Sequence, residues 1–305
     1  MLLITLSVCA LTSPLLQPID LFGSSLASEL HSAQKSVAAA AELLALEPRR
    51  ARDVLHAGLD AQPGSRWITH VDQSTIVVAL LGAEETLLSI AYHPQRQEFA
   101  IAAIGGGAYV HRWQGDLEEP VLGQASPTAN VICTPARWCH ETDALVVHLQ
   151  QTGLGMPLQL LPRGPEGESC CEGLLDVLFG RADVYLAPPA RFTADEPPLP
   201  PPVIAAFDLL FREAEGCLSD VYGQSHDVLA IESEAIYSEE SATPQRGVLV
   251  CADSMHPYFV RATAVAFPPF KSELQRLTDK LLINGKYDGP PLRLVDGSGA
   301  DDGVT

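Results

Sequence analysis

The chain has 305 residues, 47% of them hydrophobic and 19% charged, so it can bury a large core and is not intrinsically disordered. Lysine and arginine number 19 against 38 acidic residues, which gives a formal net charge of −19. This field repels phosphate backbones, so we expect no nucleic-acid partner. The seven cysteines are few and odd in number, which is typical of reduced thiols in the cytosol or an organelle stroma.

Residues 1–27 are interpreted as an N-terminal extension, for which a targeting segment, a buried first strand and a misplaced start codon are the alternatives. They begin with MLLITLSVCALTSP, which resembles the apolar part of a signal peptide but has no basic residue before it. We therefore expect a soluble protein of the cytoplasm or an organelle stroma, with secretion as the alternative. No apolar run reaches the about 20 residues of a transmembrane helix, so no membrane span is expected.

Residues 28–120 are expected to form a subdomain of one helix and an antiparallel sheet. Apolar residues recur at helical spacing from Ser28 to Leu46, and Pro48 is expected to end that helix. Short β-rich runs separated by turn-forming residues then predict a meander. Its strands are Thr75–Leu81, Leu87–His93, Glu98–Ile104 and, after a glycine run, Tyr109–Trp113.

Residues 121–287 are expected to form an α/β subdomain, and 288–305 a flexible acidic tail. The predicted strands are Asn130–Thr134, Pro157–Leu161, part of 180–186, and Gly247–Ala252. The predicted helices are Glu141–Gln151, Cys171–Leu178, Val203–Glu215, Lys271–Ile283 and one that begins at Ser254. Prolines lack the backbone donor, so the segment 196–202 is interpreted as a rigid surface connection. Gly216 is expected to close the C-terminal end of the helix Val203–Glu215.

Four short motifs occur in order along the chain. They are the meander ending in Gly105-Gly-Gly-Ala-Tyr109, then Gly180-Arg-Ala-Asp-Val-Tyr185, then Glu213-Ala-Glu-Gly216 with Ser219-Asp220, and finally Arg246-Gly-Val-Leu-Val-Cys-Ala252 with His256-Pro257. Together they resemble the superfamily of inositol monophosphatases and 3'(2'),5'-bisphosphate nucleotidases, which are magnesium-dependent, lithium-sensitive phosphatases. The resemblance implies an α/β fold, a five-layer αβαβα sandwich, and a small phosphorylated ligand.

The resemblance also implies a set of site residues. In the family, clustered carboxylates hold Mg²⁺ ions that neutralise the phosphate and activate a water molecule. Where the family has Asp-Pro-Ile/Leu-Asp-Gly-Thr, this chain has His70 in place of the first Asp, Asp72 as the second, and Gln73 in place of Gly. Asp72 is therefore the candidate metal ligand, Asp72 and His70 are the candidate catalytic residues, and Ser74 and Thr75 are the candidate phosphate-binding residues.

Other carboxylates of the family pattern are missing. The Glu-Glu pair has no counterpart in 57–66, where Asp60 is the single acid, and the Trp-Asp pair falls on Pro202-Val203. Asp195 and Glu196 either shift into the site or form an exposed acidic loop. Asp72 also fits a turn-capping role, and His70 fits an ordinary surface or core histidine. The pair Cys170-Cys171 lacks a second pair at structural-zinc spacing, so zinc is not expected.

Two functional hypotheses follow. In the first, the chain has lost the metal-dependent phosphatase chemistry and acts as a binding or structural subunit, in a homodimer or a larger complex. In the alternative, it is an active phosphomonoesterase that uses Mg²⁺ and acts on inositol monophosphate or 3'(2'),5'-bisphosphate nucleotides. Mg²⁺ beside a phosphate needs several carboxylates, and the family positions supply one, which favours the first hypothesis.

Overall fold

The computed structural model describes residues 26–44, 46–60, 66–112, 117–123, 129–133, 147, 158–160, 170–189, 199–226 and 247–267. All of them belong to one compact unit, residues 1–268. Nearly all of the predicted extension and of the helix 141–151 lies outside these residues, as do Asp195, Glu196, the helix 271–283 and the tail. Within the described ranges no helix combines the length and apolar character needed to cross a membrane. The division at residue 120 and the cellular compartment stay predictions.

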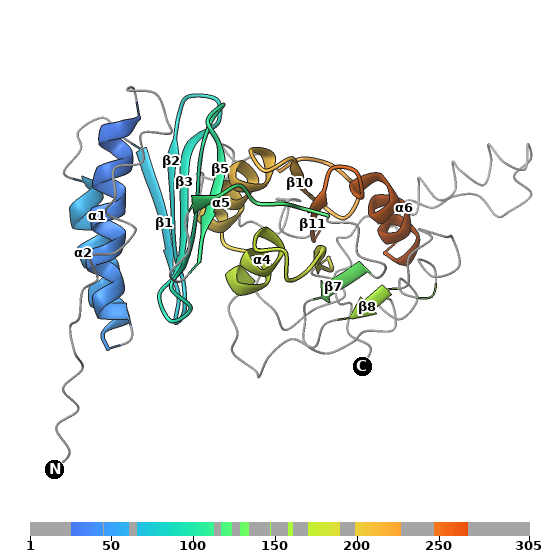
Figure 1. Ribbon diagram of the computed structural model, residues 1–305, viewed down its shortest axis with the longest axis horizontal. Helices are drawn as coiled ribbons and strands as arrows, with labels where there is room; N and C mark the ends of the chain where they lie inside the picture. The colour runs from blue at the N-terminus through green and yellow to red at the C-terminus, as the bar shows by residue number, and fades with distance from the viewer. Residues whose placement is uncertain are drawn as a thin grey trace, which may run out of the picture. The chain divides into compact units, whose positions relative to one another are not determined.

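Six antiparallel strands form the first sheet, in the order β1-β2-β3-β4-β5-β6 (Figure 1). They are β1 (Arg66–Val71), β2 (Ile76–Leu81), β3 (Thr86–His93), β4 (Glu98–Ala103), β5 (Gly107–His111) and β6 (Leu117–Glu118). Every residue of β2 and β4 is buried, because both faces of the sheet are covered. The predicted meander is confirmed, since β2, β3 and β4 are neighbouring antiparallel strands.

Two helices, α1 (Ala27–Leu44) and α2 (Pro48–Asp60), cover one face of this sheet (Figure 1). Their buried side chains, among them Val37 and Leu55, pack with strand residues such as Ile90. The prediction that Pro48 only ends a helix is wrong, because Pro48 also begins α2. Proline suits a first helical position, where its missing N–H has no intrahelical partner to lose.

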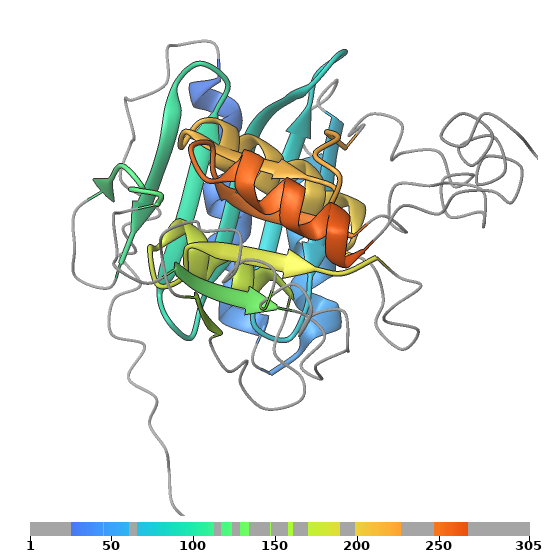
Figure 2. The same cartoon turned by 90° about the vertical axis from the view of Figure 1, so that its right-hand side faces the viewer.

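Two further helices, α4 (Cys170–Leu178) and α5 (Pro201–Arg212), form the middle layer between the two sheets. The second sheet has the order β10-β11-β9-β7-β8. Its strands are β10 (Gly216–Ser219), β11 (Val248–Ala252), β9 (Val184–Ala187), β7 (Ala129–Cys133) and β8 (Leu158–Leu160). The helix α6 (His256–Ala266) packs on its outer face, as Figure 2 shows from that side. The layers therefore run α, β, α, β, α, which confirms the predicted sandwich.

Both predicted ends of α5 are wrong. Pro201 and Pro202 belong to its first turn rather than to the preceding connection, for the same reason that Pro48 can begin α2. The helix ends at Arg212, and the left-handed conformation that follows is taken by Glu215 with φ 59°, not by Gly216. Gly216 instead begins β10 at a point where a Cβ atom would collide with the side chain of Leu122. A side chain here would force Leu122 to shift, so it is the small size of Gly216, and not a positive φ, that suits this position.

An ion-pair network joins the first sheet to the middle layer. The guanidinium of Arg181, between α4 and β9, binds both oxygens of Glu98 on β4 at 2.6 and 2.9 Å and Asp176 on α4 at 2.6 Å. Arg96 in the β3–β4 turn binds Asp176 at 2.9 Å and Glu172 at 3.3 Å. Burial by itself lowers the pKa of Arg181, but the hydrogen bond to Glu98 and the charges of Asp176 and Glu98 outweigh it and raise the pKa above its usual value. Arg181 therefore keeps its positive charge within this inter-layer network.

Candidate functional site

Asp72 lies in the tight turn that joins β1 to β2. Its Oδ1 atom accepts hydrogen bonds from the backbone N–H groups of Ser74 at 2.9 Å and Thr75 at 2.7 Å, and its Oδ2 atom accepts one from the Thr75 hydroxyl at 2.8 Å. The backbone N–H of Asp72 donates to the carbonyl of Thr75, which closes the turn. The turn-capping role considered for Asp72 is therefore present, and the backbone N–H groups of Ser74 and Thr75, the candidate phosphate-binding residues, already donate to this carboxylate.

His70 is the last residue but one of β1, and it points to the same side as Asp72. Its Nε2 atom lies 3.5 Å from Oδ2 of Asp72, longer than a usual hydrogen bond. The two side chains keep 23% and 22% of their surface exposed, so solvent reaches both. The structure thus brings together His70, Asp72, Ser74 and Thr75, the four residues selected from the sequence.

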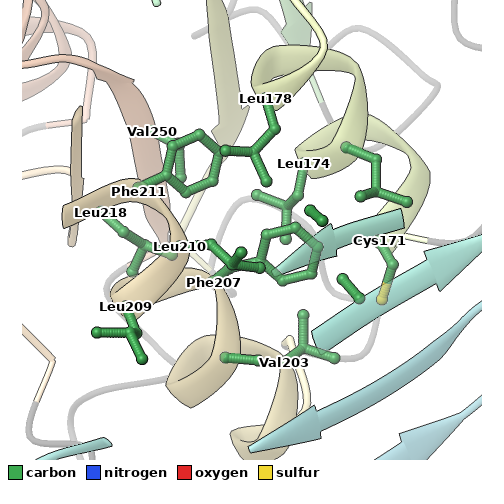
Figure 3. Close-up of a cluster of buried hydrophobic side chains, with 14 of the residues drawn as sticks. Cys171, Leu174, Leu178, Val203, Phe207, Leu209, Leu210, Phe211, Leu218 and Val250 are labelled. Carbon is green, nitrogen blue, oxygen red and sulfur yellow. The ribbon is translucent and has the colours of Figure 1, made fainter. Parts of the chain in front are cut away.

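Val203, which the resemblance matches to the family's Trp-Asp carboxylate, has no oxygen atom in its side chain. Val203 lies in the first turn of α5 and is completely buried. It belongs to an apolar cluster with Phe207, Leu174 and Cys171 between α4 and α5 (Figure 3). An apolar cluster has no means of compensating a charged ligand.

Cys171 is a site residue that the sequence analysis missed. It lies on α4, is completely buried, and belongs to the same cluster as Val203 (Figure 3). Its sulfur, a nitrogen of His70 and an oxygen of Asp72 all lie within 4.8 Å of one another. No spacing rule reveals this group, because the turn and the helix are far apart in the sequence and only the layer packing joins them.

The glycine run is held by a carboxylate of the chain itself. The N–H groups of Gly105 and Gly107 each donate to an oxygen of Glu213, just after α5, at 2.9 Å. Both glycines have positive φ, 65° and 83°, as a tight turn requires. The carboxylate of Glu213 occupies these N–H donors and would repel a phosphate. The glycine run therefore anchors the β4–β5 turn to the middle layer.

A serine and a histidine also meet near the start of α6. Oγ of Ser219 lies 2.7 Å from Nε2 of His256 and donates to the carbonyl of Asp220, also at 2.7 Å. Burial lowers the pKa of His256, and the charges of Asp253 and Asp220 oppose this only in part. Ser219 is 1% exposed, so a substrate has no access to its hydroxyl. The pair connects α6 to β10 rather than forming a nucleophile with its base.

The comparisons with known proteins identify the fold. No protein-family model matches the sequence, and no curated protein matches it either. Among solved structures, the extragenic suppressor protein suhB from Bartonella henselae superposes with a TM-score of 0.55 at 14% identity, over 77% of this chain and 98% of that one. The inositol monophosphatase from Anabaena (Nostoc) sp. superposes with a TM-score of 0.55 at 15% identity, over 80% and 98%. The chain has the inositol monophosphatase fold.

The same fold occurs in CysQ from Bacteroides thetaiotaomicron, a bacterial member of the inositol monophosphatase family. It superposes with a TM-score of 0.50 at 16% identity, over 74% of this chain and 97% of that one. The resemblance drawn from the four motifs is therefore confirmed at the level of the fold.

The residues at this site of the inositol monophosphatase fold do not suit the Mg²⁺ that the resemblance implies. Mg²⁺ requires near-octahedral oxygen ligands. Within the described residues, Asp72 is the one carboxylate of the group formed with His70 and Cys171. The other two members offer imidazole nitrogen and sulfur, which are poor ligands for so hard a cation.

Proposed function

We propose that this chain is a member of the inositol monophosphatase fold without the magnesium-dependent phosphatase chemistry, and that it acts as a binding or structural subunit. The observation that carries the proposal is Val203. It is fully buried among apolar side chains at the position where a metal-bound carboxylate is expected. The turn of Asp72 supports the same conclusion, since its amides and its carboxylate satisfy one another.

Phosphate release tests the loss of activity. We expect no magnesium-dependent release above the background from inositol monophosphate or from adenosine 3',5'-bisphosphate. The variant Asp72→Asn serves as the matched control, because a contaminating phosphatase would leave its activity equal to that of the unaltered protein. Magnesium-dependent turnover that Asp72→Asn abolishes would overturn the proposal and establish the phosphomonoesterase alternative.

Calorimetric titration gives a second test that does not depend on the choice of substrate. One carboxylate leaves Mg²⁺ mostly hydrated, so we expect no saturable heat at millimolar Mg²⁺ and almost no change in melting temperature. The net charge of −19 adds only a diffuse attraction, which physiological salt screens beyond about 8 Å. A saturable isotherm that Asp72→Asn removes would contradict the proposal.

A subunit without chemistry acts through its surface, and we propose that it does so in a homodimer or a larger protein complex. Closed homodimers are the commonest assemblies of soluble proteins. Sedimentation velocity of the purified full chain tests the homodimer directly. A single monomeric species across micromolar concentrations would reject the homodimer.

A further inference from the structure

The group His70, Asp72 and Cys171 offers an imidazole nitrogen, a carboxylate oxygen and a sulfur, a combination that does not suit hard cations such as Mg²⁺. Imidazole nitrogen and thiolate sulfur favour borderline and soft divalent ions, and a carboxylate completes many zinc sites. We propose that these three residues form a binding site for Zn²⁺, with the fourth position open to water or to a small ligand.

The distances between the ligand atoms support this site. Ligand atoms on a tetrahedral zinc ion lie about 3.3–3.6 Å apart, as bonds of about 2.0–2.3 Å require. Nε2 of His70 and Oδ2 of Asp72 are 3.5 Å apart, which already matches that separation. A nitrogen of His70, an oxygen of Asp72 and the sulfur of Cys171 all lie within 4.8 Å of one another, so small side-chain movements bring the three ligands to zinc-binding separations.

The surroundings fix one ligand and leave an entry path. Hydrogen bonds from Ser74 and Thr75 hold the carboxylate of Asp72 in place, as outer-shell donors do at zinc sites. Cys171 forms the buried floor, while His70 and Asp72 are partly open to solvent. When the ion binds, the thiol proton of Cys171 leaves to the solvent and the sulfur binds as thiolate.

This site goes beyond the proposed function and does not depend on it. Val203 supplies no carboxylate from α5, whereas the negative charge of a Cys171 thiolate on α4 would be compensated by the bound Zn²⁺ itself. Zinc binding can therefore fail while phosphate release is still absent, so failure of the zinc site and failure of the proposed function are told apart by separate measurements.

Cobalt substitution tests the site in the reduced, metal-stripped full chain. Co²⁺ replaces Zn²⁺ at such sites, and a Co²⁺–thiolate bond produces a strong charge-transfer absorption in the near ultraviolet. We expect this absorption to saturate with about one ion per chain and to disappear when Zn²⁺ is added. Cys171→Ala should abolish the absorption. His70→Gln should weaken Co²⁺ binding at least 100-fold, because loss of a direct ligand should cost no less than the about 100-fold that loss of a residue supporting a ligand can cost.

The matched controls are Cys170→Ala, which removes the neighbouring thiol, and His56→Gln, which removes an exposed histidine of α2. Both should bind Co²⁺ as the unaltered chain does. His70 is partly exposed, so His70→Gln keeps the test valid even if Cys171→Ala fails to fold. The site is rejected if no absorption saturates below millimolar Co²⁺, if His70→Gln binds normally, or if Cys170→Ala rather than Cys171→Ala removes the signal.

Discussion

Replacing Arg181 by methionine should destabilise the protein by about 2–3 kcal/mol. The substitution keeps the aliphatic volume but removes the guanidinium that binds both oxygens of Glu98, whose side chain is 11% exposed. Removing one partner of a fully buried pair costs about 3–5 kcal/mol, because the other charge is left uncompensated. The side chain of Arg181 is 37% exposed, so water reaches the site and the cost is smaller.

Urea unfolding followed by circular dichroism measures this loss, and the melting temperature should fall by about 5–10 °C. Arg50→Met is the matched control, because Arg50 pairs with Glu47 at side-chain exposures of 64% and 54% and should cost less than about 0.5 kcal/mol. In a Glu98→Gln background, the cost of Arg181→Met should drop by at least about 1 kcal/mol. An equal cost in both backgrounds, or a cost no greater than that of Arg50→Met, would refute the reasoning.

Three further predictions concern single positions. Val203→Asp should destabilise the fold by about 3–5 kcal/mol, because it places a charge in an apolar cluster. Millimolar Mg²⁺ should not restore the melting temperature of this variant, and a recovery with Mg²⁺ would show that other ligands converge there. Gly107→Ala should cost about 1–2 kcal/mol in urea unfolding because φ is 83° at this position, and a neutral result would show that the turn relaxes. Burial, with the charges of Asp253 and Asp208, raises the pKa of Cys217 to about 11, so its alkylation followed by mass spectrometry should be slow at pH 8 and accelerate toward pH 11. The folded state then holds its thiol proton longer than the unfolded chain does, so stability should decline as pH rises from about 9 through 11.

The sequence was most informative where burial on both faces of a sheet leaves a continuous apolar run. β2 and β4 are such strands, and their boundaries follow from the turn residues between them. The sequence was least informative at prolines, because a proline is compatible both with the end of one helix and with the first turn of the next. Pro48 and Pro201 each begin a helix, and the sequence around them did not distinguish this outcome from a helix end or a connection.

The candidate site was predictable only in part. A local motif identified His70, Asp72, Ser74 and Thr75 together, because they are close in sequence. His70 lies near the end of β1, and the other three lie in the turn that follows. Cys171 joins them through the packing of α4 against the first sheet, which no local pattern encodes. For the same reason, the sequence gives no sign that Glu213 binds the glycine run across the two layers.

The turn that carries Asp72 also bears on how such a chain tolerates metal shortage and substitution. A carboxylate that relied on a cation for compensation would make folding depend on the supply of that cation. Here the compensation comes from the amides of Ser74 and Thr75, which are part of the turn itself. The chain should therefore fold in the presence of chelators. Substitutions at neighbouring ligand positions can also accumulate one at a time during evolution, because none of them leaves the charge of Asp72 uncompensated.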